Sequence, residues 1–189
     1  DVNGNSATCN TTVTVTDDQD PVLTCPANIT QPAVTDNCGR IINYSVSGTD
    51  NCTFTITQTD GTGYSSGDLF PVGTTTQSYQ ITDASGNTST CTFSVTIQDL
   101  QFPTITGVPG NLTVFTPSTS CNAVASWVAP IASDNCPGVV LTTTNLPGSV
   151  FPLGATTVTY TAVDASGNTT TSSFIVTVID NIAPLFDCP

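Results

Sequence analysis

Cysteine thiols and aspartate carboxylates are the side chains of this sequence whose types and spacing could support chemistry. The 189 residues contain eight Cys and fourteen acidic residues against a single basic residue, Arg40, with no His and no Met. Without imidazole or lysine amine, the chain lacks the usual general base and Schiff-base nucleophile. The acids stand at turns and junctions. We therefore expect no enzymatic activity in this sequence.

The net charge excludes some classes of binding partner, and the number of cysteines indicates the cellular compartment. The formal net charge is −13, and both nucleic acids and anionic membranes are bound mainly through Lys and Arg. Eight cysteines indicate an oxidising compartment, and the sequence has no apolar run long enough to span a membrane. We expect an extracellular or cell-surface protein with no nucleic-acid partner and no membrane span in this segment.

A repeat of about 80 residues organises the chain. The segment FPVGTTTQSYQITDASGNTSTCTFSVTIQD at 70–99 returns as FPLGATTVTYTAVDASGNTTTSSFIVTVID at 151–180, and its second half also occurs at 1–17. A period of this length with strand-like patterning is typical of a tandem array of all-β modules. The sequence predicts the C-terminal strand of a truncated repeat (1–17), a full module with two disulfides (18–99), a full module with one disulfide (100–180) and the start of a further repeat (181–189).

Alternating apolar and polar residues predict short strands in both full modules. Phe93, Val95 and Ile97 would face one side of a strand while Thr and Ser face the other. The Asp-Ala-Ser-Gly-Asn segments at 83–87 and 164–168 predict hairpin turns. No helical periodicity is present, and closely spaced turns favour a two-sheet sandwich over a barrel. The expected strands lie at 41–46, 53–57, 77–82 and 92–98, and at 124–128, 139–143, 158–163 and 173–179.

The links between modules are short and end in proline. They run from Asp17 to Pro21, from Asp99 to Pro103 and from Asp180 to Pro184. Such segments are stiff connections instead of flexible tethers. Equal modules on stiff links predict a rod.

Comparison of the two modules suggests how the cysteines pair. Four cysteines allow three pairings. Cys25 and Cys91 of the first module have no counterparts in the second, as expected if they bond each other, because losing one alone would leave a free thiol. A metal site is the rival interpretation, but the spacings are not those of zinc sites and no His is present. We predict disulfides Cys25–Cys91, Cys38–Cys52 and Cys121–Cys136, with Cys9 and Cys188 paired outside the segment.

Several short motifs together resemble the hyalin repeat (HYR) family. They are Thr24-Cys25-Pro26, Asp50-Asn51-Cys52, Phe70 to Thr75, Tyr79, Asp83 to Asn87 and Cys91-Thr92-Phe93, with a second set at Asp134-Asn135-Cys136, Phe151 to Thr156, Tyr160 and Asp164 to Asn168. The resemblance covers essentially the whole chain. It implies an immunoglobulin-like β-sandwich related to fibronectin type III, in extracellular tandem arrays involved in adhesion.

Calcium is the cofactor that the acidic residues suggest. Ca²⁺ takes six to eight oxygen ligands from carboxylates, amides and carbonyls. In an immunoglobulin-like module the loop between the last two strands lies at the N-terminal end, near the preceding junction. The predicted ligands are Asp17, Asp18, Asp20, Asp50, Asn51, Asp83 and Asn87 at the first junction, and Asp99, Asp134, Asn135 and Asp164 at the second. The alternative is that these groups cap turns and are solvated.

Asparagine glycosylation is a further expectation. Asn-x-Ser/Thr sequons are frequent in this Thr-rich chain, and Asn28 and Asn111 occupy matched positions in the two modules. They are the predicted glycosylation sites.

Two functions from different classes fit these features. The first is a structural building block of an extracellular fibre or long cell-surface adhesin, whose partners are neighbouring modules of the same protein and other copies in a fibre. The second is an adhesin module that binds a glycan or a protein receptor, which predicts an exposed aromatic cluster.

Overall fold

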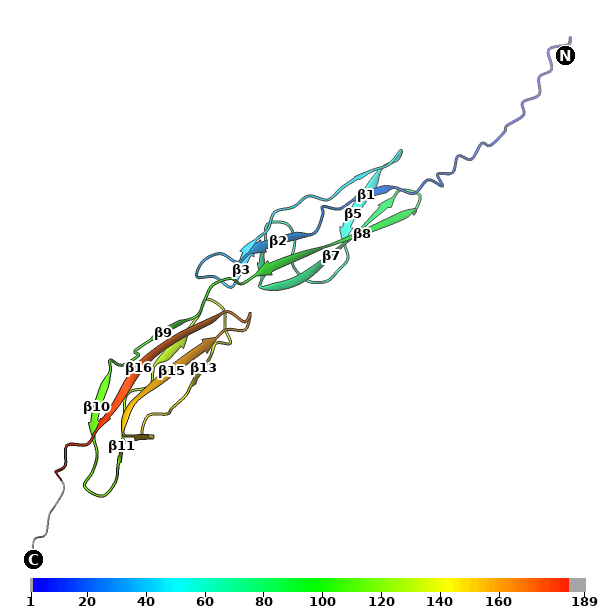
Figure 1. Cartoon of the computed structure of the whole chain (residues 1–189). Coiled ribbons are helices and arrows are strands. Elements are labelled where there is room, and N and C mark those ends of the chain that lie inside the picture. Colours follow the sequence, from blue (N-terminus) through cyan, green and yellow to red (C-terminus); the bar gives the residue numbers. More distant parts are fainter. Residues whose placement is uncertain (1, 184–189) are drawn as a thin grey trace, which may run out of the picture. The chain divides into compact units, whose positions relative to one another are not determined.

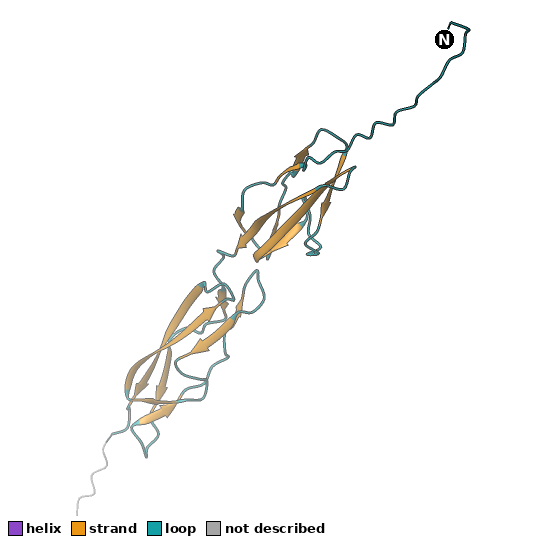
Figure 2. Ribbon diagram, turned by 90° about the vertical axis from the view of Figure 1, so that its right-hand side faces the viewer, coloured by secondary structure: helices purple, strands orange, loops and turns teal. Residues whose placement is uncertain are grey.

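The computed structural model describes residues 2–183 and contains strands, turns and loops but no helix in that range (Figures 1 and 2). The all-β prediction is confirmed. Accordingly, the described residues contain no helix that could cross a membrane. The chain forms two compact units. The first consists of the chain up to residue 29 with 43–68 and 75–95, and the second of 30–42, 69–74 and the chain from 96 onward.

The first repeat contributes eight strands. The long strands β7 and β8 form the middle of a four-stranded sheet in the order β2-β8-β7-β5, and β1-β4 and β3-β6 form two short sheets. The strands are β1 (Val22–Thr24), β2 (Ile29–Pro32), β3 (Gly39–Ile41), β4 (Ser47–Thr49), β5 (Phe54–Gln58), β6 (Leu69–Pro71), β7 (Gly73–Asp83) and β8 (Thr88–Gln98).

The second repeat has the same strand plan. Its four-stranded sheet has the order β10-β16-β15-β13, and the two short sheets are β9-β12 and β11-β14. Strands β15 and β16 are antiparallel, whereas β10 pairs with β16 in parallel. The strands are β9 (Thr104–Thr106), β10 (Leu112–Phe115), β11 (Asn122–Val124), β12 (Ile131–Ser133), β13 (Val140–Thr143), β14 (Val150–Pro152), β15 (Gly154–Val163) and β16 (Thr169–Ile179).

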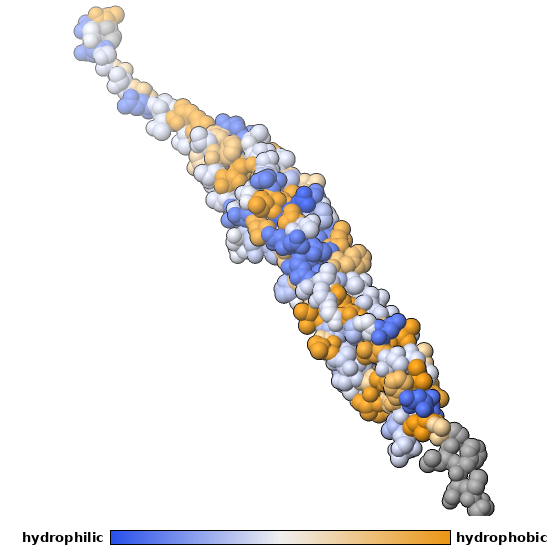
Figure 3. Space-filling model, turned by 90° about the vertical axis from the view of Figure 1, so that its left-hand side faces the viewer, coloured by the Kyte–Doolittle hydropathy of each residue, from blue (hydrophilic) through white to orange (hydrophobic). Residues whose placement is uncertain are grey.

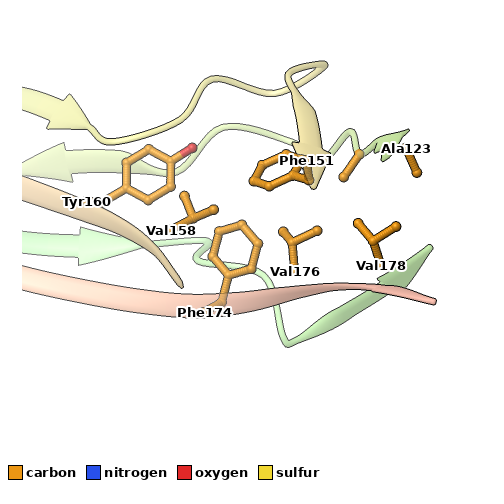
Figure 4. Packing of buried hydrophobic residues seen from close by; sticks show 8 residues of the cluster. Ala123, Phe151, Val158, Tyr160, Phe174, Val176 and Val178 are labelled. Carbon is orange, nitrogen blue, oxygen red and sulfur yellow. The ribbon is translucent and has the colours of Figure 1, made fainter. Parts of the chain in front are cut away.

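The core of the second repeat lies between the four-stranded sheet and the β11–β14 pair. Alternate residues of β15 and β16 point inward, and Phe151 of β14 meets them from the other side (Figure 4). Trp127 packs edge-on against Phe174 with ring centroids 5.0 Å apart, and its Nε1 donates to the Tyr160 hydroxyl at 2.7 Å. The buried cluster consists of Ala123, Ala125, Phe151, Val158, Tyr160, Phe174, Val176 and Val178.

Hairpin turns between the two long strands of each repeat are held by their first aspartate. Asp83 Oδ1 accepts hydrogen bonds from the backbone N of Ser85 (2.9 Å) and of Asn87 (2.8 Å). Gly86 has a φ of 95°, a conformation that favours glycine because it has no Cβ. Asp164 makes the same bonds in the second repeat. The predicted turns are therefore present.

Three strand predictions differ from the structure. Of the strand expected at 41–46, only Ile41 lies in a strand, β3, and 42–46 contain none; the backbone N and carbonyl O of Tyr44 both bond the Ser66 hydroxyl there. Residues 5–20, which include most of the expected strand at 1–17, contain no strand, and none of the described strands pairs with this segment. The strand expected at 124–128 is instead β11. Ala123 and Ala125 are buried there while Val124 and Val128 are exposed, so the register is the reverse of the one that valines suggest.

Candidate functional site

The structure contains two matched clusters of carboxylate and cysteine side chains. In the first acid–cysteine cluster, the ligand-type atoms of Asp17, Asp50 and Cys52 all lie within 4.8 Å of one another. Asp50 follows β4, and its Oδ2 accepts a hydrogen bond from the backbone N of Cys52 at 2.8 Å. Asn51 Nδ2 donates to Asp17 Oδ1 at 3.4 Å. A tight turn therefore brings the aspartate and the cysteine together.

The second acid–cysteine cluster repeats this arrangement with Asp99, Asp134 and Cys136, again within 4.8 Å. Asp134 Oδ2 accepts from the backbone N of Cys136 at 3.0 Å. The side-chain amide of Asn135 contacts the Asp99 carboxylate. Asp99 and Cys136 are each only 5% exposed, so this cluster is more deeply buried than the first.

The turn asparagines connect each hairpin to its cluster. Asn87 Nδ2 donates to the carbonyl oxygen of Asp17 at 3.1 Å and to Asp83 Oδ2 at 2.8 Å. Asn168 makes the equivalent bonds to the carbonyl oxygen of Asp99 (3.2 Å) and to Asp164 Oδ2 (2.8 Å). Hence Asp83 and Asp164 act as turn caps that hold the asparagines.

Three carboxylate oxygens of the clusters are buried without a hydrogen-bond partner, namely Asp17 Oδ2, Asp50 Oδ1 and Asp99 Oδ2. A buried carboxylate oxygen left without a partner is costly. Such atoms therefore mark a position that a cation could fill.

Hydrogen bonds also shift the pKa values of Asp17 and Cys52 in the first cluster. The hydrogen bond from the Cys52 thiol, followed by that from the backbone of Gln19, lowers the pKa of Asp17. The same bond raises the pKa of the Cys52 thiol. For Asp83, burial by itself would raise the pKa, but the hydrogen bonds from the turn lower it overall. The cluster carboxylate Asp17 is therefore held in its charged form.

The structure brings together only part of the predicted calcium ligands. Asp17, Asp50 and Asn51 converge at the first junction, and Asp99, Asp134 and Asn135 at the second. Asp18 and Asp20 are exposed and do not join the first cluster. The two turn aspartates and Asn87 use their side chains for capping and for the junction backbone.

Disulfide Cys25–Cys91 is present in the structure, with Cα atoms 5.9 Å apart. It joins the segment after β1 to β8 and spans 66 residues of sequence. The joint absence of these two cysteines from the second module was the sequence signal for this pair.

The other two predicted disulfides are wrong in this structure. Cys38 is bonded to Cys136, with Cα atoms 4.8 Å apart, and Cys52 and Cys121 are free. The loop carrying Cys38 belongs to the second compact unit, and the Asn135 amide beside Cys136 also contacts the carbonyl oxygen of Asn37. The disulfide therefore joins consecutive repeats instead of closing a loop within one. Cys9 is free and exposed, and Cys188 lies outside the described residues.

The topology of the second repeat explains why the intramodule pairing fails. Cys121 immediately precedes β11, which pairs with β14 just before β15 begins. Cys136 comes shortly before β13, whose Val140 pairs with Val163 at the far end of β15. A ten-residue strand rises about 3.3 Å per residue, or roughly 30 Å in total. Disulfide-bonded Cα atoms must lie within about 7 Å.

The predicted glycosylation sites occupy matched, exposed positions. Asn28 Oδ1 accepts from the backbone N of Ser94 at 2.9 Å, and Asn111 Oδ1 accepts from that of Ile175 at 2.9 Å. Their modification remains a prediction.

Sequence reasoning missed a polar network in the first compact unit. Gln77 is fully buried and its Oε1 accepts from Gln58 Nε2 at 2.8 Å and from the Tyr44 hydroxyl at 3.1 Å. Asp60 accepts from the backbone N of Ser78 at 2.9 Å and from Thr62 Oγ1 at 2.6 Å. The available signal was a glutamine at the position where the second repeat has buried Val158.

Comparisons with known proteins agree with the repeat structure. The HYR domain profile matches residues 16–97 and again 98–178. Hyalin from Lytechinus variegatus is 32% identical over 98% of this chain and 36% of its own length, and Hyalin from Strongylocentrotus purpuratus is 39% identical over 65% of this chain and 11% of its own length. The chain thus spans about a third or less of these curated relatives.

More distant matches include an adhesin and cadherin structures. The serine-rich adhesin for platelets of Staphylococcus aureus (strain MRSA252) is 31% identical over 70% of this chain and 11% of its own length. Protocadherin gamma B7 extracellular domains 1–4 align over 85% of this chain and 50% of that structure, with 15% identity and a TM-score of 0.38.

These matches and the disulfides indicate an extracellular or cell-surface repeat protein. With two profile matches that together run from residue 16 to 178, the chain belongs to the HYR domain family.

Proposed function

We propose that this chain is a structural tandem-repeat building block of an extracellular fibre or long cell-surface adhesin, in which the repeats form a stiff, protease-resistant rod and carry out no catalysis. The observation that supports this most strongly is the Cys38–Cys136 disulfide, which ties one repeat to the next. A covalent bond next to a link of a few residues removes most of the freedom of that link.

Packing around the links supports the same proposal. Pro21 and Pro103, which end the first two links, are fully buried. The Asp99 side chain accepts from the backbone N of Gln101 at 3.1 Å, so the link is also hydrogen-bonded internally. Ordered links that bury their prolines resist bending.

Solution scattering and proteolysis test this function. The oxidised chain is compared with the double variant Cys38→Ser/Cys136→Ser, and the matched control is Cys52→Ser/Cys121→Ser, which removes only free thiols. We expect the parent and the control to give the same scattering curve and the same slow thermolysin cleavage, and the first variant to give a broader distance distribution and faster cleavage at 99–103. Identical behaviour of all three chains would overturn the proposal.

We also propose that the acid–cysteine clusters bind Ca²⁺. Buried carboxylate oxygens without a partner at Asp17, Asp50 and Asp99 favour it, and hard oxygen donors suit this ion. Asp17, Asp50 and Asn51 would hold it at the first junction, and Asp99, Asp134 and Asn135 at the second. The neighbouring sulfur atoms are poor ligands for a hard cation, so water would complete the coordination.

Calorimetric titration with calcium chloride, and with magnesium chloride for comparison, tests the cation site. We expect binding that raises the melting temperature and that Asp17→Asn or Asp99→Asn each weakens, whereas Asp18→Asn leaves it unchanged because Asp18 lies outside the cluster. If millimolar calcium gives neither heat of binding nor a change in melting temperature, the clusters do not bind Ca²⁺.

A second function is supported by the similarity to a protein named as an adhesin for platelets. A module that binds a glycan or protein receptor would need an exposed binding face. On the face that Figure 3 shows, apolar residues are mixed with polar ones. Tyr44 packs against the rings of Tyr79 and Phe93, and Trp127 packs against the ring of Phe174. A glycan array probed with the whole chain, in calcium and in chelator, tests this alternative, since reproducible binding would favour it over a purely structural role.

A further inference from the structure

We propose that Cys52 and Cys121 are the open halves of two further disulfides of the Cys38–Cys136 kind. Cys52 would bond the Cys38-like cysteine of an HYR repeat on its N-terminal side, and Cys121 the Cys136-like cysteine of an HYR repeat on its C-terminal side. The inference deepens the proposed structural function by naming the partner and the bond at each end.

Cys52 stands in the same local structure as the bonded Cys136. Each cysteine is the third residue of an Asp-Asn-Cys turn whose aspartate accepts the cysteine backbone N–H, at 2.8 Å for Asp50 and 3.0 Å for Asp134. Each lies within 4.8 Å of a junction aspartate, Asp17 or Asp99. The first cluster therefore has the same aspartates and the same turn as the second but lacks a second cysteine bonded to Cys52. Cys52 is exposed, whereas Cys136 is buried.

Cys121 stands in the same local structure as the bonded Cys38. The loop before Cys38 is fixed by backbone bonds from Ala33 N to Gln98 O (2.7 Å) and from Asn37 N to Val34 O (3.1 Å). The loop before Cys121 repeats both.

The matching bonds run from Thr116 N to Ile179 O (3.0 Å) and from Ser120 N to Pro117 O (3.4 Å). Each cysteine then directly precedes a short strand, β3 or β11, that pairs with β6 or β14.

A hollow beside Cys121 matches the place where the next repeat docks on the Cys38 loop. Beside that loop a hollow of about 300 Å³ is lined by 33–35, 99–101 and Asn135 of the next repeat. Its counterpart of about 520 Å³ is lined by 116–121, Asp180, Ile182 and Ala183. The equivalent site is therefore formed but lacks an Asp-Asn-Cys turn, and its rim carries an exposed thiol.

The bond-forming step balances as a thiol–disulfide exchange. Two thiols lose two protons and two electrons and form one S–S bond, while a small disulfide such as oxidised glutathione takes up both and is released as two thiols. In the extracellular compartment of this chain such oxidants are available.

A doubled chain tests the proposal directly. Residues 164–189 match 1–26 in register, so joining Pro189 of one full chain to Ala27 of a second copy continues the repeat. The first copy carries Cys52→Ala and the second copy carries Cys121→Ala. The candidate pair at the new junction is then Cys121 of the first copy with Cys52 of the second. The chain is refolded with reduced and oxidised glutathione, purified as a monomer, alkylated and cleaved before aspartate.

We expect a cross-linked peptide containing Cys121 of the first copy and Cys52 of the second. The matched control carries Cys121→Ser in the first copy. In this control we expect Cys52 of the second copy to be fully alkylated. Alkylation of both cysteines in the parent doubled chain, or a Cys121–Cys136 bond within one repeat, would overturn the proposal. A Cys25–Cys91 peptide in every sample shows that the chains have folded.

This outcome is separable from the fate of the proposed function. If the new bond forms but scattering shows that the Cys38–Cys136 bond does not stiffen the chain, the disulfide assignment stands and the rod proposal fails. If the new bond does not form but the original chain is stiff, the rod proposal stands and the disulfide assignment fails.

Discussion

At the scale of single residues, asparagine side chains secure the junctions. Asn168 reaches both the backbone of Asp99 and the carboxylate of Asp164. Asn168→Ala leaves a buried carboxylate and a junction carbonyl short of one donor each, so we expect a loss of about 1–3 kcal/mol in the free energy of unfolding. Chemical denaturation measures it. Asn145→Ala in the loop between β13 and β14 serves as control. An equal loss of unfolding free energy in both variants would show that the Asn168 side chain has no particular role at the junction.

Asp60 gives the first compact unit a defined acid sensitivity. Burial by itself would raise its pKa, but hydrogen bonds from Thr62, the Ser78 backbone and Gln58 lower the pKa of Asp60 from 3.8 to about 2. Because the folded-state pKa lies below the unfolded one, the stabilisation is complete above about pH 4 and disappears as pH falls through about 2.

Asp60→Asn should therefore lower the free energy of unfolding at neutral pH by about 1 kcal/mol, a value reduced for the solvent screening of this partly exposed carboxylate, and should flatten the fall in stability between about pH 4 and pH 2. Urea unfolding at several pH values measures both effects. Asp20→Asn, which changes an exposed carboxylate, is the control. An unchanged pH profile in Asp60→Asn would show that another group causes the acid sensitivity.

At the scale of elements, the hairpin turn between β15 and β16 depends on a backbone conformation that glycine adopts readily. Gly167 has a φ of 90°, and a Cβ added there would meet no other atom within 4 Å. Gly167→Ala thus isolates backbone strain, and we expect a cost of about 1 kcal/mol. Gly110→Ala, where φ is not positive and space is also open, should be neutral or slightly stabilising. Thermal unfolding of both variants checks the difference.

The sequence predicted the elements whose pattern is local. Alternation identified β8 and β16, and the Asp-Ala-Ser-Gly-Asn segments identified their turns. The short strand β11 was placed too late because Val124 faces solvent while the small residues Ala123 and Ala125 fill the core. Side-chain size at a tight sheet-to-sheet contact overrides the ordinary preference of valine for the interior.

The candidate site was predictable only in part, for a physical reason. The Asp-Asn-Cys turns and junction aspartates indicated where acidic groups gather, because turns fix neighbours in sequence. The partner of Cys38 depends on which end of a repeat its loop occupies, and the local pattern carries no such information. Gln77 and Asp60 likewise form their network through contacts between residues far apart in sequence.

At the scale of the whole molecule, the central feature is the Cys38–Cys136 disulfide, which runs from one repeat to the next. Cross-links between consecutive modules make an array in which each repeat is tied to its neighbour by both backbone and sulfur. In this view the acid clusters and the asparagine contacts align the junction, and the disulfide fixes it. Cys52 and Cys121 are free and exposed, and under the proposal above they would extend the same plan to neighbouring repeats.

Disulfide mapping of the oxidised, unmodified chain tests this claim most directly. Cleavage before aspartate places Cys38, Cys52, Cys121 and Cys136 on separate peptides, 36–49, 50–59, 99–133 and 134–163. We expect a cross-linked species of 36–49 with 134–163, and we expect 50–59 and 99–133 to be recovered as alkylated peptides. Recovery of 36–49 bonded to 50–59 and of 99–133 bonded to 134–163 would contradict this expectation.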